Sequence, residues 1–390
     1  MKKPVRLSNS GMNRYMGCGR SYQFHYIDKW RSHIKSSALF FGSAVDVACN
    51  YMLENFDKRN EPYFRDEAFS LFQKTWTSQF DKDSNTLIEL RCSPNIKYFK
   101  SDFDLEVLNA EDLEELGLSS PEDVKSYLDS RKLMEAELKA NGGRWDLISI
   151  EDRVEHNEIT WFCLLRKGYY MIDAYWKEIL PEFESILCLQ RPIELEDENK
   201  NVVNGIAEFV AKIKDGRICI VDNKTAGTPY EPESVSTSQQ LALYKQIMNI
   251  QATEGGEWTT PIECAAYAVM SKKINKDKVK TCQSCGYIAD SSHKTCNAKV
   301  DGKRCDGEWT VVTSLSASTQ FIVDNISEDF GNTVLENAST IVACIEKGIF
   351  PKNFSKCHDD YGSTCQFLHL CHKGDKSNLY KVEAPNGEKK

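Results

Sequence analysis

The 390-residue chain lacks several features that define whole classes of protein. It has no run of about 18 apolar residues, so no membrane-spanning helix is expected. The N-terminus, Met1 to Arg6, is followed by no apolar segment, which argues against secretion and favours a cytoplasmic location. No Gly-x-x-x-x-Gly-Lys-Ser/Thr motif and no internal repeat are present, so any unwinding motor would be a separate chain.

Positive charge is also in the minority, with 49 Lys and Arg against 58 Asp and Glu and a net charge of −9. This balance argues against a protein that coats nucleic acid through its overall charge, but it is compatible with a local basic channel. The charge is unevenly distributed. Residues 101–124 carry nine acids and no Lys or Arg, whereas residues 271–310 carry nine Lys or Arg against five acids. We expect the acidic stretch to be a solvated surface loop.

The pattern of apolar residues predicts a mixed fold. Helices are expected over a turn-interrupted region at 7–50 and over 38–56, 65–80, 121–140, 161–180 and 238–248. Strands are expected over 183–189, 202–213, 217–222 and 262–270, with Asp215-Gly216 forming a hairpin turn. Strands followed by a helix and another strand predict a mixed central sheet in an α/β (α+β) fold.

Two acids and a lysine form the most specific pattern in these strands. Glu208 lies in the strand before the hairpin, and Asp222 and Lys224 end the strand after it. Residues two apart on a strand share a face, so Asp222 and Lys224 should project together, with Glu208 beside them. Carboxylates bind hard ions such as Mg²⁺ or Mn²⁺, and a lysine can stabilise charge on a phosphate. Taken alone, Asp-x-Lys is far more typical of a surface ion pair at a strand end, and it is the neighbourhood of Glu208 and the apolar run into Asp222 that favours a site.

Four segments resemble the RecB-type branch of the PD-(D/E)XK nuclease superfamily. They are Gly42-Ser43-Ala44-Val45-Asp46, Gly205-Ile206-Ala207-Glu208, Asp222-Asn223-Lys224-Thr225 and Gln240-Leu241-Ala242-Leu243-Tyr244. The resemblance implies a restriction-endonuclease-like core and a Mg²⁺- or Mn²⁺-dependent DNA nuclease, more specifically an exonuclease acting on DNA ends or single strands. It implies Asp46, Glu208 and Asp222 as metal ligands, Lys224 as the charge-stabilising group, and Gln240 and Tyr244 as auxiliary residues.

The sequence departs from that family at two positions. Asp46 stands where the family usually has His, and Glu208 where Asp is commoner. Both side chains can still bind a hard metal. The substitution at Asp46 nevertheless favours an alternative, a non-catalytic DNA-end binding or scaffold module with a nuclease fold. The partners implied are DNA and a separate helicase or recombination protein.

Fifteen cysteines, an odd number in a chain without a secretion signal, indicate metal ligation rather than disulfides. Cys282-x2-Cys285-x10-Cys296-x8-Cys305 has the spacing of a structural zinc ribbon, in which Gly286 and Gly307 make the tight turns. Five lysines lie on the segment that leads into it. They form either a solvated face or a phosphate-contacting arm for DNA: Lys272, Lys273, Lys276, Lys278 and Lys280.

Cys357, Cys365 and Cys371 near the C-terminus need a fourth ligand, which Cys18 can supply. In order and in flanking aromatics the four are similar to the cysteines of AddB-like and CRISPR-adaptation-type nucleases, and the resemblance implies a structural [4Fe–4S] cluster. Zinc, unligated thiols, and ligation by His358, His369 or His372 are the alternatives. The predicted division is 1–55 (N-terminal helices), 56–182 (helical insertion), 183–271 (nuclease core), 272–310 (zinc ribbon), 311–375 (C-terminal helix and cluster segment) and 376–390 (tail).

Overall fold

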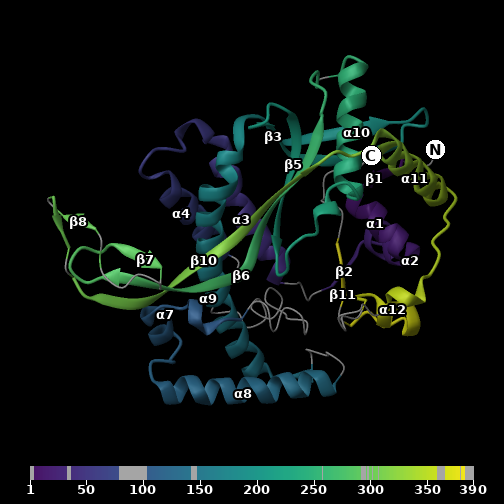
Figure 1. Cartoon of the computed structure of the whole chain (residues 1–390). Helices are drawn as coiled ribbons and strands as arrows, with labels where there is room; N and C mark the ends of the chain where they lie inside the picture. Colours follow the sequence, from purple (N-terminus) through teal and green to yellow (C-terminus); the bar gives the residue numbers. More distant parts are fainter. Residues whose placement is uncertain are drawn as a thin grey trace.

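A mixed sheet of seven strands forms the centre of the computed structural model (Figure 1). The structure describes residues 4–32, 37–78, 103–141, 147–256, 258–290, 296, 298–300, 302–305, 307–357, 365–377 and 379–382. The strands are β1 (Arg6–Ser8), β3 (Phe183–Glu196), β4 (Val202–Ile213), β5 (Ile218–Ala226), β6 (Cys264–Cys282), β7 (Ile288–Asp290) and β10 (Trp309–Asp324). The central order is β1-β4-β5-β6-β10; β3 also pairs with β4, and β7 with β6. Since β1–β4 and β5–β6 are parallel and the other pairs antiparallel, the expected mixed α/β sheet is confirmed.

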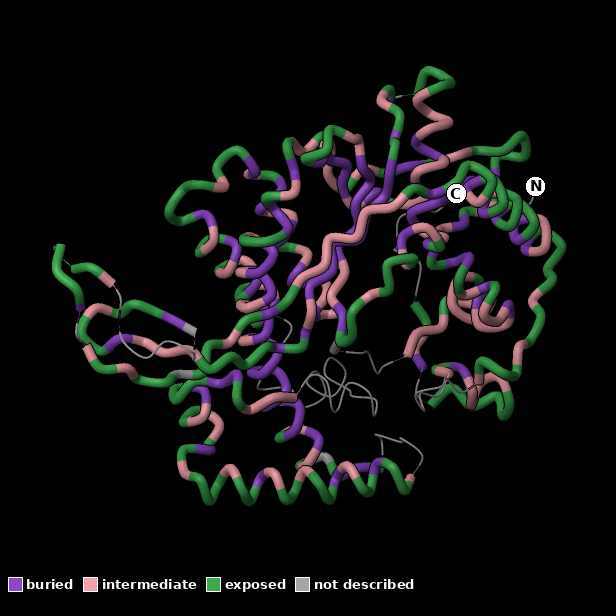
Figure 2. The backbone as a smooth tube through the Cα atoms, in the orientation of Figure 1, coloured by how far each residue is buried: buried purple, intermediate pink, exposed green. Residues whose placement is uncertain are grey.

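Helices cover both faces of this sheet. One face carries α3 (Ser37–Glu54), α4 (Phe64–Thr77) and α9 (Ile150–Ala174); the other carries α1 (Asn9–Gly17), α2 (Gly19–Tyr22), α10 (Gln239–Thr253) and α11 (Glu328–Glu346). Alternation along β5 separates the two cores, because Cys219 and Val221 enter the first and Ile220 enters the second. Figure 2 shows the buried residues along the central strands and on the helix faces turned toward them.

The strands β6 and β10 continue well beyond the sheet as a two-stranded ribbon (Figure 1). Their antiparallel register runs from Ala265 opposite Asp324 to Cys282 opposite Trp309. The far end holds β7 and the short strands β8 (Lys299–Val300) and β9 (Lys303–Arg304). The zinc-ribbon cysteines therefore lie at the tip of an arm that starts at the central sheet.

The acidic stretch is the clearest departure from the sequence-based expectation. The prediction of a surface loop over 101–124 is wrong where the structure describes a 3₁₀ turn at Leu105–Val107 and α7 (Ala110–Glu115), whereas α8 (Pro121–Ala140) confirms the helix expected over 121–140. Asn109 and Asp112 form a capping box that starts α7. Asp112 is buried and accepts two hydrogen bonds from Arg166 of α9, at 2.6 and 2.8 Å. A long-range ion pair therefore fixes a segment whose local composition favours a loop.

The two ends of the chain also form short strands. The side chain of Ser8, at the end of β1, accepts a hydrogen bond from the Gly11 N–H and caps α1. Near the C-terminus, α12 (Leu368–Lys373) precedes β11 (Leu379–Lys381), which pairs with β2 (Trp30–Ser32). Among the helices that the structure describes, none is long and apolar enough to cross a membrane.

Candidate active site and metal centres

The candidate active site lies where β4 and β5 separate. Their antiparallel ladder ends at the Phe209–Val221 pair, so the next residues, Glu208 and Asp222, lie beyond the last paired rung. There the Glu208 carboxylate accepts hydrogen bonds from Asn223, at 2.8 Å from the backbone N–H and 2.7 Å from the side-chain amide. The carboxylate thus takes the place of a backbone acceptor at the point where the strands separate.

Asp222 has partners on two sides. Its Oδ2 forms an ion pair with Lys224 Nζ, and its Oδ1 accepts a hydrogen bond of 2.8 Å from the Gln240 amide of α10. Asp222 is only 6% exposed. The structure therefore brings Asp222 and Lys224 to one face, as two-residue spacing predicts, and Gln240 positions the acid directly.

Asp46 of α3 completes a group of three carboxylates. Burial and then the Asp222 charge raise the pKa of Asp46 to about 6. Burial, Asp222 and Asp46 raise the pKa of Glu208 well above its ordinary value, against the two Asn223 hydrogen bonds. Burial also raises the pKa of Asp222, while Lys224 opposes that shift. The Asp222 charge thus raises the pKa of both neighbouring acids, and carboxylates whose charges disfavour one another in this way favour a bound cation.

Lys224 is the positively charged residue among the described contacts of these three carboxylates. Burial lowers the pKa of Lys224, but the charge of Asp222 and the hydrogen bond to it raise the pKa, to about 12. Its ammonium group also lies 5.7 Å from the ring centroid of Tyr267, whose hydroxyl contacts the Ser238 hydroxyl at 2.6 Å. Lys224 is thus a fixed cation, and three carboxylates beside one lysine carry an excess of negative charge suited to a divalent ion.

Tyr244 has a packing role that the sequence did not show. A Cβ on Gly205 would lie 2.3 Å from Tyr244 Cε1, so the ring occupies the space that a side chain at position 205 would need. Gln240 and Tyr244 share a face of α10, as expected; one contacts Asp222 and the other covers β4 beside Glu208.

Sequence reasoning missed two neighbours of this site. In the sequence pattern Asn223 is only the middle residue of Asp-x-Lys. In the structure it is buried and donates hydrogen bonds to both Glu208 carboxylate oxygens. Tyr175 is fully buried and begins a π-helical turn, Tyr175–Ile179, at the end of α9. Burial, with added effects of Cys49 and Glu208, raises its pKa well above the ordinary value. Such turns occur often at functional sites, but no local pattern marks this one.

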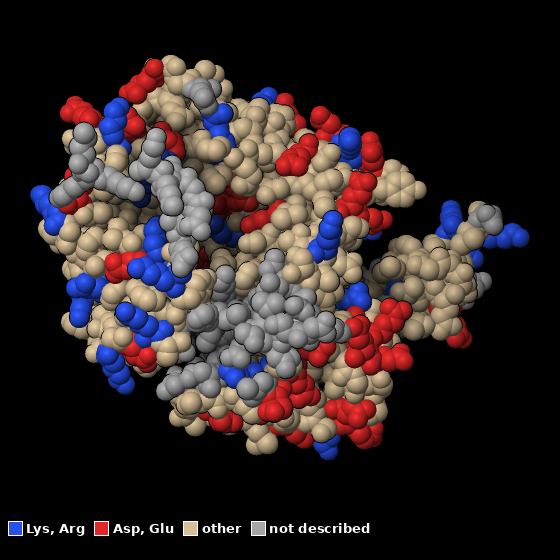
Figure 3. Space-filling model, turned by 180° about the vertical axis from the view of Figure 1, so that it is seen from behind, with Lys and Arg blue, Asp and Glu red and all other residues tan. Residues whose placement is uncertain are grey.

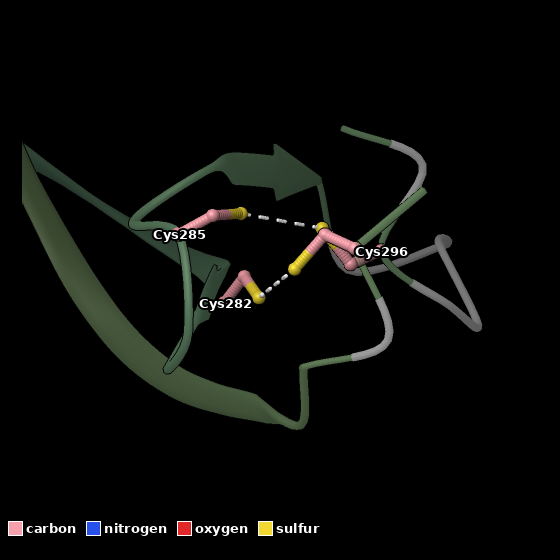
Figure 4. Close-up of side chains that lie close together, drawn as sticks. Cys282, Cys285 and Cys296 are labelled. Atoms are coloured by element: carbon pink, nitrogen blue, oxygen red, sulfur yellow. Dashed lines mark hydrogen bonds between the residues drawn. The ribbon is translucent and has the colours of Figure 1, made fainter. Parts of the chain in front are cut away.

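The ribbon cysteines form a compact group (Figure 4). The sulfur atoms of Cys282, Cys285, Cys296 and Cys305 all lie within 4.8 Å of one another. Two sulfur pairs are 3.5 and 3.6 Å apart, close to the roughly 3.8 Å edge of a tetrahedron with Zn–S bonds of about 2.3 Å. Burial opposes ionisation of Cys282, but backbone N–H groups of Cys285 and Ser284 lower its pKa to about 6. The donor set fits a closed metal site with four thiolate ligands.

The expected turns support this geometry. Gly286 has φ +69°, in the region that favours glycine. A Cβ on Gly307 would lie 2.4 Å from Cys282 Sγ, and the Gly307 N–H donates to Cys305 Sγ at 3.4 Å. Gly286 therefore makes the turn, and Gly307 lets the chain pass close to the sulfurs.

The four distributed cysteines also meet, between α2 and α12. Cys18, Cys357, Cys365 and Cys371 line one cavity of about 20 Å³. The Asn353 N–H donates to Cys18 Sγ at 3.4 Å, and the Cys365 N–H donates to the Cys357 carbonyl at 2.9 Å. His372 Nε2 lies 3.8 Å from Cys357 Sγ, while His358 lies outside the described residues. The four cysteines thus line one mostly apolar space, but among the residues that the structure describes, the cysteines whose sulfurs come close enough to share one ion are those of the ribbon.

The five lysines on the segment that leads into the ribbon, here called the lysine arm, lie in different environments. Lys272 is only 4% exposed, and its ammonium lies 5.9 Å from the ring centroid of Phe41. Lys276 pairs with Asp104 at 3.1 Å and with Glu106 at 2.8 Å. Lys273 and Lys278 are exposed, and Lys280 is half-buried. Exposed Lys299, Lys303 and Arg304 extend the positive charge onto β8 and β9, and Figure 3 shows basic side chains at the ribbon tip.

Comparison with known proteins agrees with this geometry. No curated protein sequence matches the chain. The PD-(D/E)XK nuclease superfamily matches it over residues 164–372, which is more than half of its length and includes Glu208, Asp222, Lys224 and the ribbon. Members of this superfamily are typically metal-dependent nucleases. The fold, the separated strands and this match agree, and the chain belongs to the PD-(D/E)XK nuclease superfamily.

Proposed function

We propose that the chain is a Mg²⁺- or Mn²⁺-dependent deoxyribonuclease that works as an exonuclease on DNA ends or single strands. The observation that carries the proposal is the convergence of Asp46, Glu208 and Asp222 beside Lys224. A surface ion pair does not explain one buried and two half-buried acids, all with raised pKa values, around one lysine, because such an arrangement is costly without a cation.

Each residue has a defined part in this proposal. Asp46, Glu208 and Asp222 would hold the divalent ion, which when bound polarises a phosphate and lowers the pKa of a water molecule. Asn223 and Gln240 fix the Glu208 and Asp222 carboxylates. Lys224 holds a proton throughout the neutral pH range and stabilises negative charge that develops on the phosphate.

The two cysteine groups would be structural. We propose zinc for the ribbon and a [4Fe–4S] cluster for Cys18, Cys357, Cys365 and Cys371, which join segments from opposite ends of the chain. The proposed setting is DNA recombination, repair or mobile-element processing, with a helicase or recombination protein on a separate chain.

Cleavage of labelled linear single- and double-stranded DNA, with Mg²⁺ or Mn²⁺, tests the proposal. Asp222→Asn preserves the oxygen that accepts from Gln240 but removes the charge, so we expect at least a ~100-fold loss of rate. Asp215→Asn, an exposed acid in the turn that joins β4 to β5, is the matched control and should cleave normally.

Two outcomes would contradict the proposal. If Asp222→Asn cleaves at the wild-type rate, the assigned site is wrong. Alternatively, wild-type protein loaded with metal could bind DNA ends tightly without degrading either strand, and the chain would then be the scaffold module that Asp46 favours.

A further inference from the structure

An open hollow of about 470 Å³ lies beside the cavity of the four distributed cysteines. Cys18 and Cys365 line both spaces, so the hollow adjoins the proposed metal centre. The other side chains that line it carry hydroxyl, amide or cationic groups: Ser10, Asn13, Arg14, Ser21 and Lys356. No Asp or Glu of the described residues lines the hollow, so its two cations face no carboxylate across it.

Arg14 of α1 is a half-buried cation without an acidic partner in the part of the chain that the structure describes. Its Nη1 donates to the Ser21 hydroxyl at 3.2 Å. Burial lowers the pKa of Arg14, and the like charge of Arg31 also lowers it, against Tyr26 and Cys365. A cation that has lost water without gaining a counter-ion is costly, so an anion in the hollow would stabilise it.

A metal centre in the cysteine cavity would not neutralise the hollow. With four thiolate ligands, either Zn²⁺ or a [4Fe–4S]²⁺ cluster carries a net charge of about −2. Arg20 and Lys352 line the cysteine cavity but not the hollow, and they already supply two positive charges there. Arg14 lines the hollow but not the cavity. Lys356 lines both, is exposed, and forms no ion pair with any described residue.

The neutral side chains complete a set of hydrogen-bond donors. Asn13 Oδ1 accepts from the Gln239 amide at 3.1 Å, which leaves the N–H groups of Asn13 to donate. The Ser21 oxygen accepts from Arg14, which leaves the hydroxyl hydrogen of Ser21 to donate. Arginine together with hydroxyl and amide donors is a set typical of contacts with phosphate oxygens.

The hollow is also connected to the candidate active site through two successive residues of α10. Gln239 contacts Asn13, and the next residue, Gln240, donates to Asp222 at 2.8 Å. Two glutamine side chains and one step along the backbone span at most roughly 20 Å between Asn13 and Asp222. That distance corresponds to about six nucleotides at the rise of a stacked strand and to fewer in an extended one.

We propose that this hollow binds a phosphate group of the DNA strand whose scissile phosphate lies at Asp222 and Lys224, with Arg14 and Lys356 as the phosphate-binding cations. The proposal rests on the proposed function and adds to it a point of attachment separate from the lysine arm. An internal phosphodiester and a 5′-terminal phosphate offer the same oxygen acceptors, and the experiment separates the two. Strands long enough to reach both places should bind more tightly than dinucleotides.

Binding can be measured without cleavage, by fluorescence anisotropy of a labelled single-stranded oligonucleotide of about 12 nucleotides without added Mg²⁺ or Mn²⁺. We expect Arg14→Met and Lys356→Met each to weaken binding about 3- to 10-fold and to reduce the log–log salt slope by about 0.7, the value for one phosphate contact on a single strand. Lys58→Met is the matched control and should stay within twofold of wild type. Lys58 is an exposed lysine without an ion pair among the described residues, and it follows α3 on the other face of the sheet.

A second pair of variants leaves both cations in place. Ser10 is exposed in the first turn of α1, where an acid is compatible with the helix dipole, so Ser10→Glu should fold normally. Its carboxylate would oppose a phosphate in the hollow and should weaken binding about 3- to 10-fold, whereas the uncharged Ser10→Gln should stay within twofold of wild type. Tighter binding of a 5′-phosphorylated strand that Arg14→Met abolishes would assign the terminal phosphate, and equal binding of 5′-phosphate and 5′-hydroxyl strands would assign an internal one.

The hollow is not a phosphate site if Arg14→Met, Lys356→Met and Ser10→Glu all keep the wild-type affinity and salt slope, or if Ser10→Gln loses as much affinity as Ser10→Glu. It is also refuted if the two Met variants lose affinity only together with the iron or zinc of the cysteine cavity, because the cations would then serve that centre. Wild-type protein that binds the strand but cleaves no DNA after metal is added would instead refute the proposed nuclease activity. The two failures are distinguishable because the binding assay does not depend on cleavage.

Discussion

Substitution of Gly205 by alanine tests how the sheet and α10 build the candidate site. The new Cβ would lie 2.3 Å from Tyr244 Cε1 and 2.8 Å from Cζ. Both are atoms of a rigid ring that is only 8% exposed, so no flexible chain end can move aside. Ordinary contact needs about 3.4 Å or more, so the ring or the strand must shift by roughly 1 Å.

The size of the effect follows from two opposing terms. Overpacking of this kind costs about 1–3 kcal/mol, while replacing glycine by alanine in a strand gains about 0.5–1 kcal/mol. We therefore expect Gly205→Ala to lower the free energy of unfolding by about 1–2 kcal/mol. Expressed as free energy, the loss of cleavage rate should exceed the loss of stability. The reason is that Tyr244 lies one turn after Gln240, which donates to Asp222 at 2.8 Å. A displacement of ~1 Å at such a contact can cost up to about 100-fold in rate.

Urea unfolding and a double-mutant cycle with Tyr244→Ala provide the assay. In the Tyr244→Ala background the clash is absent, so Gly205→Ala should be neutral or stabilising, and the coupling energy should be about 1–3 kcal/mol. Gly42→Ala is the control, since a Cβ there meets only Thr225 Oγ1 at an ordinary 3.6 Å. The reasoning is refuted if Gly205→Ala is as stable as wild type, or if its cost persists without the Tyr244 ring.

Two further predictions concern charge and metals. Without metal, the pKa of Asp46 is raised to about 6, so the folded state holds this proton more tightly than the unfolded chain does. The free energy of unfolding should therefore fall as the pH rises from about 4 to 6. Urea titrations should show a flatter pH dependence for Asp46→Asn. Purified protein should contain about one zinc per chain together with iron and a visible absorbance band. Cys296→Ser should remove only the zinc, and Cys18→Ser should remove only the iron and the colour. Elemental analysis that finds no iron after anaerobic purification would exclude the cluster.

Features set by short spacing could be predicted from the sequence. Asp222 and Lys224 share a face because strands have a period of two, and Gln240 and Tyr244 share a face because a helix turns every 3.6 residues. A few backbone dihedrals join the two residues of each pair, so their relative placement is nearly fixed by local conformation. The ribbon cysteines lie further apart in the chain, but their spacing is typical of a structural metal site, and their sulfurs converge as expected.

Features that depend on distant contacts could not be predicted. The segment expected as a loop over 101–124 contains α7, whose buried Asp112 pairs with Arg166, more than fifty residues away in the chain. Lys272 belongs by composition to an exposed basic run, yet it is buried beside Phe41 of α3. Asn223 became visible as a partner of Glu208 only when the end of the β4–β5 ladder was known. Sequence pattern gives the direction of a side chain along its own element, and tertiary packing decides what it meets.

The cavity lined by the four distributed cysteines shows how packing can prepare a metal site. The two chain ends are joined by ordinary contacts: Tyr15 donates its hydroxyl hydrogen to the Ile349 carbonyl at 2.7 Å, and Asn353 donates to the Gly17 carbonyl at 3.0 Å. Gly19 fits closely against Pro351, where a Cβ would approach to 2.6 Å. These bonds already bring the two chain ends together. A metal bound there therefore need not offset the whole entropic cost of closing the long loop between the termini. The fold brings the four cysteines to one cavity, and a ligand bound there would add stability to an interface that exists without it.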